Sequence, residues 1–306
     1  MNGPRFIAST AFLLALLLTG IPCDAVPAGT LDKVKQSGSI TLGIRESSYP
    51  LSYLDGQGHP IGYHMDICRA IAEAVRVQTG LAQVQIQTVP VTSGNRIPMM
   101  VEGAIDLECG STTNNRQRQK LVAFAPTTYV ATVRTAVRVA DGMTSLAQLN
   151  GKTVVSTAGS TSVQFLKARQ SGRDFKLTEL LGNDHAESFR KLESGEAAAF
   201  VMDDNLLAGL IASAAKPKDF AMIGEAINTE PVAIMLRRDD PAFKALVDAT
   251  VKAMMKSGEV GRLYAKWFQS PIPPKGINLN FPMSGVLSGL IQFPGDDPAE
   301  TFRPAE

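Results

Sequence analysis

The chain has 306 residues, which is enough for two domains at roughly 150 residues each. Its composition, 44% hydrophobic and 19% charged, is ordinary for a soluble globular protein. The formal net charge of +1 argues against a bulk polyanion such as nucleic acid as the partner, because nucleic-acid-binding proteins carry a concentrated basic surplus.

The N-terminal segment predicts export. Residues 7–21, IASTAFLLALLLTGI, form an uncharged apolar run after a single arginine, which is typical of a signal peptide. The run is shorter than the ~20 apolar residues that a membrane span needs. Cleavage after Ala25 or after Ala28 fits, and Cys23 leaves a lipoprotein signal open, although the proline before it suits lipidation poorly. We expect a signal peptide over residues 1–25 and a periplasmic location.

After this segment, short apolar runs alternate with amphipathic helical stretches. In the first half, the pattern predicts strands at 39–44, 84–89 and 104–109 and helices at 62–75 and 96–103. In the second half, it predicts strands at 152–157, 176–181 and 197–202 and helices at 160–170 and 185–195. Strands that alternate with helices predict a parallel-type α/β sheet in each half.

Two β-rich stretches, residues 124–139 and 225–240, are too long for simple linkers. If both are crossovers, the chain leaves one domain, builds a second and returns, so that two connecting strands form a hinge. Two further helices are expected over residues 241–258 and 259–270, with a Ser-Gly break between them. The segment after Pro271 ends in a polar, Pro-rich sequence, which predicts loose order.

The two halves echo each other where a strand ends. MMVEGAIDLECGST (residues 99–112) and KLESGEAAAFVMDD (residues 191–204) each give a helix end, a glycine, an apolar strand and then a polar cluster. Open α/β sheets bind ligands beyond the carboxyl ends of their strands. We therefore expect both clusters at functional edges, which can face one another in a two-domain protein.

The first cluster offers hydrogen-bond donors to an anion. Ser111, Thr112 and Thr113 follow a strand, and Arg116 and Arg118 come directly behind them. Free backbone N–H groups at a strand-to-helix turn attract anions, and the arginine fork matches a carboxylate. Composition alone favours the other interpretation, in which a Ser or Thr caps a helix and the arginines behind it are solvated.

The second cluster offers an acceptor. Asp203 and Asp204 follow an apolar strand, where a desolvated carboxylate needs a compensating partner. One of them can cap the next helix, and the other can receive an ammonium group. Capping alone explains one aspartate better than two.

Three further side chains stand at strand or helix ends. Arg45 follows a strand, and Arg96 starts a helix, where a cation is unfavourable unless an anion lies nearby. His185 opens another helix, although in isolation an exposed loop histidine explains it better. The turn at residues 156–162, STAGSTS, is rich in hydroxyl groups. Together these residues offer donors for two anions and an acceptor for one cation, which fits a zwitterion with an extra carboxylate.

The cysteines and histidines indicate no metal site and no other cofactor. The chain lacks Cys-x-x-Cys and His-x-x-x-His spacings, and its three histidines are scattered. Cys68 and Cys109 can pair in an oxidising compartment, or either can be a buried small hydrophobe.

Several motifs resemble the periplasmic glutamate/aspartate-binding proteins, which are polar amino acid solute-binding proteins of ABC importers. They are GIRESSYPLSY, NRIPMM, ECGSTTNNRQRQK, DHAESFRKLESGEAAAFVMDDNLLAG and KWFQSPIPPKGINLNF, and the resemblance covers residues 31–282. It implies an α/β, two-lobed periplasmic-binding-protein-like fold, in which two crossover strands join the lobes and the ligand cleft lies between them. Relatives commonly pair the cysteine of ECG with one where this chain has Ile234, so the resemblance leaves Cys68 as a substitute partner.

The resemblance also implies roles for individual residues. Thr113 and Arg118, with Ser111, would hold the ligand's α-carboxylate, and Ser160 would close on it from the second lobe. Asp203 would take the α-ammonium. The pocket for a side-chain carboxylate would be formed by Arg45, Arg96, His185 and Thr157.

The domain organisation follows from the same resemblance. We expect a signal peptide at 1–25, lobe 1 at 31–130 plus 231–282, lobe 2 at 131–230, and a C-terminal tail at 283–306. The expected function is capture of L-glutamate or L-aspartate by hinge closure and delivery to the permease of an ABC importer. The protein would act as a monomer, and not as an enzyme.

Two alternatives remain at this stage. The fold also hosts dehydratases that act on small cyclic carboxylates such as prephenate or arogenate, for which His185 and Glu46 are the candidate acid or base residues. A sensor or receptor domain is the third interpretation, but no second transmembrane segment or signalling module follows. Neither alternative has a chemistry-specific pattern in the sequence.

Overall fold

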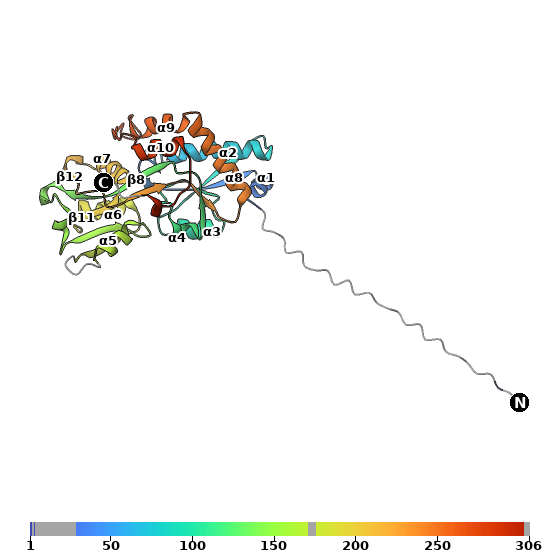
Figure 1. Ribbon diagram of the computed structural model, residues 1–306, viewed down its shortest axis with the longest axis horizontal. Helices are drawn as coiled ribbons and strands as arrows, with labels where there is room; N and C mark the ends of the chain where they lie inside the picture. The colour runs from blue at the N-terminus through green and yellow to red at the C-terminus, as the bar shows by residue number, and fades with distance from the viewer. Residues whose placement is uncertain (2, 4–28, 171–175, 303–306) are drawn as a thin grey trace.

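The computed structural model describes residues 1, 3, 29–170 and 176–302. Two lobes, each with its own sheet, lie side by side (Figure 1). The predicted signal peptide lies outside the described residues, except for residues 1 and 3. Within the described ranges, no helix has the length and apolar character needed to cross a membrane.

The first lobe contains a five-stranded sheet in the order β5-β1-β6-β14-β7. Its strands are β1 (Ser39–Ile44), β5 (Gln85–Pro90), β6 (Leu107–Glu108), β7 (Val122–Phe124) and β14 (Met235–Arg237). Strand β1 pairs in parallel with β5 and β6, whereas β14 pairs antiparallel with β6 and β7. The expected parallel arrangement therefore holds for three strands, and the returning chain adds an antiparallel strand.

Helices and a small second sheet cover this lobe. The helices are α1 (Thr30–Ser37), α2 (Tyr63–Thr79), α3 (Arg96–Val101), α4 (Arg116–Gln119), α8 (Pro241–Lys256), α9 (Glu259–Phe268) and α10 (Gly285–Gln292). The small sheet has strands β2 (Ser47–Ser48), β3 (Ser52–Leu54) and β4 (Pro60–Ile61). In α2, Tyr63, Ile67 and Ile71 recur every four residues and are fully buried, because this spacing keeps them on one helix face.

The second lobe repeats the plan. Its strands are β8 (Tyr129–Arg138), β9 (Thr153–Thr157), β10 (Thr178–Gly182), β11 (Ala199–Asp203), β12 (Phe220–Ile223) and β13 (Thr229–Val232). Its helices are α5 (Ser162–Gln170), α6 (His185–Glu193) and α7 (Asp204–Ser213). Short 3₁₀ turns are η1 (Val139–Asp141), η2 (Leu146–Leu149), η3 (Pro217–Asp219) and, near the C-terminus, η4 (Ala299–Thr301). Strand β9 lies between β10 and β11 and is parallel to both, whereas β8 runs antiparallel to β11 and β12.

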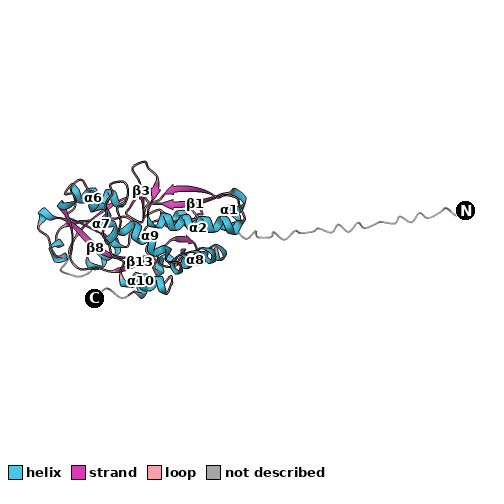
Figure 2. Ribbon diagram, turned by 90° about the horizontal axis from the view of Figure 1, so that it is seen from above, coloured by secondary structure: helices cyan, strands magenta, loops and turns pink. Residues whose placement is uncertain are grey.

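Two strands connect the lobes. The first part of β8 pairs with β13, from Tyr129↔Val232 to Thr132↔Thr229, and the rest of β8 pairs with β11 and β12. In Figure 2, β8 lies beside α6 and α7 of the second lobe, and β13 lies nearer to the helices of the first lobe. The two β-rich stretches are therefore crossovers, as the sequence predicted.

The expectation of loose order after Pro271 is wrong for the described residues. Leu287 of α10 is buried in the core of the first lobe, and the Ser284 hydroxyl caps α10 by accepting from Leu287 N–H. Beyond α10, Gly295 C=O accepts from Thr127 N–H. The segment is polar, but its backbone is hydrogen-bonded to the rest of the protein.

The two cysteines form a disulfide. Cys68 of α2 and Cys109 after β6 are bonded with a Cα–Cα distance of 6.2 Å, within the usual range. The bond closes a sequence separation of 41 residues, which contributes about 4 kcal/mol in the chain-entropy description. Because Cys109 precedes Ser111 by two residues, the disulfide also anchors the start of the first polar cluster to α2.

Candidate functional site: a charged cavity between the lobes

A small cavity of about 10 Å³, about the space of a single water molecule, lies between the lobes. The first lobe lines it with Ser93, Arg96, Ser111 and Thr113, and the second with Ser160, Thr161, His185, Met202, Asp203 and Leu206. Most of these residues follow the carboxyl end of a strand, which is where open sheets place their ligand sites. The two strand-end clusters of the sequence therefore meet at one cavity.

The nine residues singled out from the sequence are all at or directly behind this cavity. Six of them line it: Arg96, Ser111, Thr113, Ser160, His185 and Asp203. The other three are each hydrogen-bonded to a lining residue: Arg45 to Ser111, Arg118 to Thr113 and Thr157 to His185.

Arg45 and His185 meet across the cleft. Arg45 Nη2 lies 3.2 Å from His185 Nε2, and His185 Nδ1 lies 2.9 Å from Thr157 Oγ1. Since a guanidinium only donates, Nε2 accepts and the ring proton is on Nδ1, where it donates to Thr157. Burial, with Arg45 and Arg96 nearby, holds the pKa of His185 well below its usual range, so the ring is neutral. Burial also lowers the pKa of Arg45 to about 9, which leaves it charged at neutral pH.

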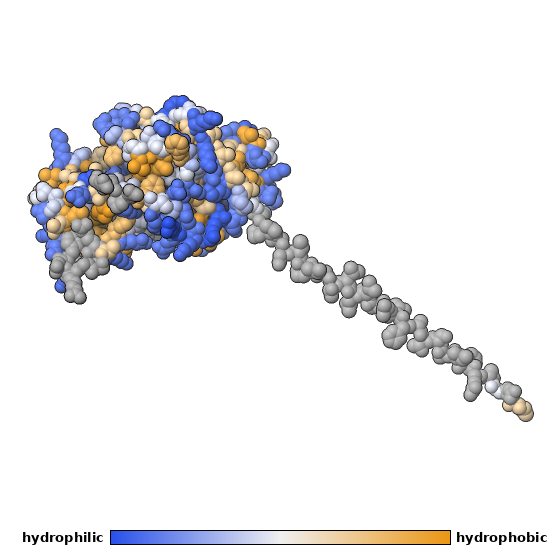
Figure 3. Space-filling model, in the orientation of Figure 1, coloured by the Kyte–Doolittle hydropathy of each residue, from blue (hydrophilic) through white to orange (hydrophobic). Residues whose placement is uncertain are grey.

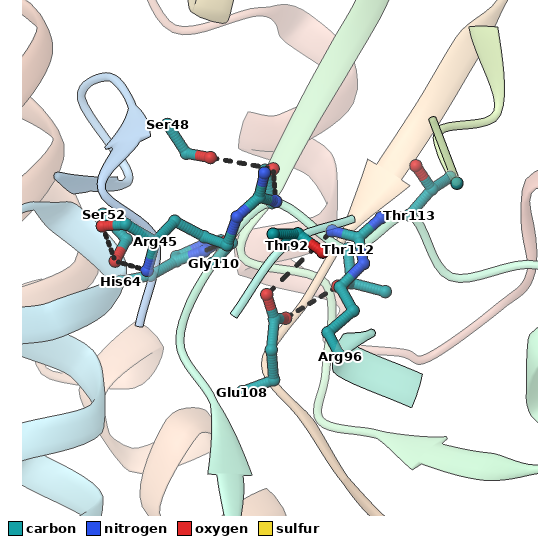
Figure 4. Close-up of polar contacts among 12 residues, drawn as sticks. Arg45, Ser48, Ser52, His64, Thr92, Arg96, Glu108, Gly110, Thr112 and Thr113 are labelled. Atoms are coloured by element: carbon teal, nitrogen blue, oxygen red, sulfur yellow. Dashed lines mark hydrogen bonds and ion pairs between the residues drawn. The ribbon is translucent and has the colours of Figure 1, made fainter. Parts of the chain in front are cut away.

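Arg96 is held by a carboxylate that sequence analysis missed. Arg96 is 2% exposed, and its Nη1 lies 4.0 Å from Oε1 of the fully buried Glu108. The other oxygen of Glu108 accepts from Thr112 Oγ1 at 2.7 Å (Figure 4). Glu108 is the anion that a cation at the start of α3 requires. The Nε and Nη1 atoms of Arg96 make no hydrogen bond with any described residue.

Arg118 reaches both lobes. Its Nη1 donates to Thr113 C=O at 2.8 Å, and its Nη2 donates to Gly159 C=O of the second lobe at 3.2 Å. Burial and the nearby Arg96 lower its pKa to about 10. The helix cap that competed with an anion site comes from Asn115, whose side chain accepts from Arg118 N–H, and not from a Ser or Thr. The capping role and the donor cluster therefore involve different residues.

The two adjacent aspartates have different surroundings. Asp204 accepts from Thr132 and from Asn205 N–H, which ties it to β8 and to its own helix. Asp203 lines the cavity and is 4% exposed. Burial, with Glu230 and Asp204 nearby, raises the pKa of Asp203 well above its usual range. A positive group in the cavity would stabilise its charged form.

Sequence reasoning also missed Glu230, Thr161 and Ser93. Glu230 lies on the crossover strand β13, is 1% exposed and accepts from Thr113 and Thr161. Glu230 directly precedes the apolar run PVAIML, and a carboxylate next to such a run was the signal that could have identified it. Thr161 was within the hydroxyl-rich turn at 156–162, next to the residue chosen. For Ser93, the sequence carried no signal.

The arrangement matches a small ligand of mixed charge. Arg45, Arg96 and Arg118 supply buried cations, and Ser93 Oγ and Ser160 Oγ are buried polar atoms without a hydrogen-bond partner among the described residues. Asp203 supplies an acceptor on the opposite wall. No group of three or more His, Cys, Asp or Glu side chains that could hold a metal occurs in the described part of the chain.

Two lobes joined by two crossover strands, with a charged cavity between them, define a solute-binding protein. The chain belongs to the bacterial extracellular solute-binding proteins, family 3, whose family model matches residues 40–270. It is 44% identical to the L-glutamate/L-aspartate-binding protein of Pseudomonas aeruginosa over 295 aligned residues. The alignment covers 96% of this chain and 97% of that protein. It is 42% identical to the glutamate/aspartate import solute-binding protein of Escherichia coli over 292 residues, 94% of this chain and 97% of that protein.

A solved structure supports the same fold. An ancestral arginine-binding protein bound to glutamine superposes with a TM-score of 0.67 at 26% identity, over 76% of this chain and 98% of that one. The relatives named are binding proteins for transport and not enzymes, so a dehydratase is not favoured. Glu46, one of the two candidate acid or base residues, is exposed and does not line the cavity.

Proposed function

We propose that this chain is a periplasmic solute-binding protein for an acidic amino acid, L-glutamate or L-aspartate. It would be exported through a cleaved signal peptide over residues 1–25, act as a monomer, and deliver its ligand to the permease of an ABC importer. The names of the two relatives support this ligand class. The chemistry of the cavity supports it independently.

The observation that carries the proposal is that the buried guanidinium of Arg96 lacks hydrogen-bond partners for two of its nitrogens. A nine-tenths buried guanidinium with two unbonded nitrogens faces a cavity, and buried donors without partners cost about 1–3 kcal/mol each. A ligand carboxylate would satisfy these donors. Glutamine carries no such charge, so Arg96 favours an acidic side chain.

The residue roles follow the charges. Arg118, Thr113 and Ser111 would hold the α-carboxylate, with Ser160 from the second lobe, and Asp203 would take the α-ammonium. The side-chain carboxylate would meet Arg45, Arg96 and His185, with Thr157 behind the imidazole. Each charge-assisted hydrogen bond contributes about 1.5–3 kcal/mol. Several of them could offset desolvation and reach about micromolar affinity, near −8 kcal/mol.

Closure of the lobes would couple binding to delivery. Contacts such as Arg118 to Gly159 and Arg45 to His185 join residues of opposite lobes. A ligand that contacts both walls of the cavity stabilises this closed arrangement relative to an open one. The permease would then recognise the closed form.

Isothermal titration calorimetry of the chain without residues 1–25 tests the ligand. The panel is L-glutamate, L-aspartate, L-glutamine and glutarate, a dicarboxylate without the amine. We expect micromolar or tighter binding of glutamate or aspartate, and at least ~30-fold weaker binding of glutamine and glutarate. Glutamine binding as tight as glutamate would contradict the acidic-ligand proposal.

A further inference from the structure

Glu230 is a buried carboxylate that contacts both lobes from the strand that joins them. Its Oε2 accepts from Thr113 Oγ1 of the first lobe at 2.6 Å and from Thr161 Oγ1 of the second at 2.7 Å. Glu230 is 1% exposed and does not line the cavity, whereas both threonines do. It therefore lies behind the two hydroxyl groups as seen from the ligand.

The two short hydrogen bonds fix the direction of the hydroxyl protons. A hydroxyl has one proton and two lone pairs, and a carboxylate oxygen only accepts. Because each threonine donates its proton to Glu230, each can offer only lone pairs to the cavity. A neutral partner such as an amide or a water molecule would not impose this direction.

The two threonine hydroxyls near Glu230 therefore present only hydrogen-bond acceptors to the cavity, which suits a ligand group that donates. Asp203 provides a third acceptor on the same cavity, and a primary ammonium has three N–H donors. We propose that Glu230 is a positioning residue, which makes Thr113 and Thr161 acceptors for the ligand's α-ammonium and so selects amines over plain dicarboxylates. This inference rests on the proposed amino-acid ligand.

The assignment also refines the role of Thr113. Its hydroxyl, committed to Glu230, cannot donate to an α-carboxylate, so that contact falls to its backbone N–H. This N–H takes part in none of the hydrogen bonds of the described residues, whereas the flanking Asn114 N–H donates to Pro231 C=O. The same threonine can therefore meet both ends of an amino acid, with a different group for each.

The position of Glu230 links this selection to the hinge. Glu230 pairs with Ala131 in the β8–β13 ladder, and Thr161 directly precedes α5 of the second lobe. A single carboxylate in the hinge ladder therefore holds both cavity-lining hydroxyl groups, Thr113 and Thr161.

The test compares L-glutamate with glutarate on the wild-type protein and on Glu230→Gln. The amide is nearly the same size but can donate, which frees the hydroxyl protons to turn into the cavity. We expect Glu230→Gln to lose at least tenfold in affinity for glutamate and to bind glutarate unchanged or more tightly. Equal losses for both ligands would mean a merely structural role and would overturn the inference. A wild-type protein that binds neither ligand would instead contradict the proposed function.

A double-mutant cycle separates hydroxyl polarity from the simple loss of a negative charge. Thr161→Val removes the hydroxyl, and the matched Thr161→Ser retains it. If Glu230 acts through the hydroxyl, Glu230→Gln and Thr161→Val are non-additive for glutamate, and Thr161→Ser keeps the preference for glutamate over glutarate. Additive losses would overturn the inference. The two Thr161 variants also provide the test if Glu230→Gln fails to fold.

Discussion

At the scale of residues, the site consists of buried charges that hold one another. Arg96 lies against Glu108, and Arg118 donates to backbone carbonyls of both lobes. Removing one partner of a buried pair leaves an uncompensated charge, so such changes affect stability as well as binding. Affinity and stability must therefore be measured on the same variants.

Arg96 and Arg118 should differ in what they recognise. We expect Arg118→Ala to abolish binding of every amino acid, because it removes the α-carboxylate clamp. Arg96→Ala should weaken glutamate by about 10- to 100-fold, from loss of about 1.5–3 kcal/mol, and leave the weak binding of glutamine nearly unchanged. Calorimetry measures both, with the exposed Arg262→Ala as control. Unchanged glutamate affinity in both variants would contradict the site assignment.

Asp203 should limit stability in the absence of ligand. Its raised pKa means that the folded protein holds the proton more tightly than the unfolded chain, so stability is lost as pH rises from about 3.8 through the raised pKa. Asp203→Asn should therefore raise the melting temperature at neutral pH, by ~2–4 °C for each kcal/mol recovered. The same variant should lose amino-acid binding.

Thermal melts of Asp203→Asn and the wild-type protein at pH 4 and pH 7.5 test whether the substitution raises the melting temperature. The gain over the wild-type protein should be larger at pH 7.5 than at pH 4, where the wild-type carboxyl keeps its proton. The exposed Asp219→Asn is the control and should shift neither melt. A variant that is less stable than the wild type at pH 7.5 would show that the buried charge is compensated within the ligand-free protein.

The sequence predicted the residues that line the cavity better than the residues behind them. Arg96 was recognisable because a cation at a helix start is unfavourable alone, and Asp203 because two aspartates follow an apolar strand. Glu108 and Glu230 lie within strands, and their roles depend on partners elsewhere in the chain: Arg96 for Glu108 and Thr113 for Glu230. Pairings of this kind depend on how the lobes are packed, which no local pattern specifies.

At the scale of elements, hydrophobic periodicity predicted the positions of strands and helices well. Composition predicted loose order after Pro271, which is wrong for the described residues. Strand β9 lies at Thr153–Thr157, within the predicted 152–157. The segment after Pro271 is polar because much of it lies on the surface, where hydrophilic and hydrophobic residues are mixed (Figure 3). Val286 of α10 and Phe293 after it are exposed apolar residues of this segment. Its order comes from backbone hydrogen bonds and one buried leucine, which composition does not report.

The C-terminal segment should support the first polar cluster. Asn114, next to Thr113, donates through its side chain to Asp296 C=O at 2.7 Å and accepts from Ala299 N–H at 2.8 Å. Glu300 accepts from Arg116 N–H at 3.1 Å. A chain that ends at Phe293 loses these contacts but keeps α10, so it should fold and bind glutamate at least threefold more weakly.

Hydrogen exchange and calorimetry measure this effect. Amide protection over residues 112–119 should fall in the chain that ends at Phe293 and stay unchanged in a control chain that ends at Phe302. Retention of both protection and affinity in the shorter chain would show that the turn is held by β13 alone, through Asn114 N–H and Pro231 C=O.

At the scale of the whole molecule, the lobes touch through backbone as well as side chains. Asn205 Nδ2 donates to Tyr49 C=O across the cleft at 3.4 Å, and a Cβ on Gly209 would lie 2.2 Å from Tyr49 Cβ. Contact this close requires a glycine on the helix that faces the first lobe. A glycine at this position thus allows α7 to approach Tyr49 of the first lobe.

Gly159 gives the sharpest test of closure. Its φ is +78°, and a Cβ there would lie 2.6 Å from Ser93 O and 2.7 Å from Gly94 N of the opposite lobe. Gly159→Ala should therefore weaken glutamate binding and reduce ligand-induced compaction in small-angle scattering. Gly151→Ala is the matched control, because its φ is +75° with open space around the Cβ, so it carries the same backbone strain of about 1–2 kcal/mol without the contact. If both variants bind and compact alike, the strain alone explains the loss, and closure does not depend on the approach of Gly159 to the first lobe.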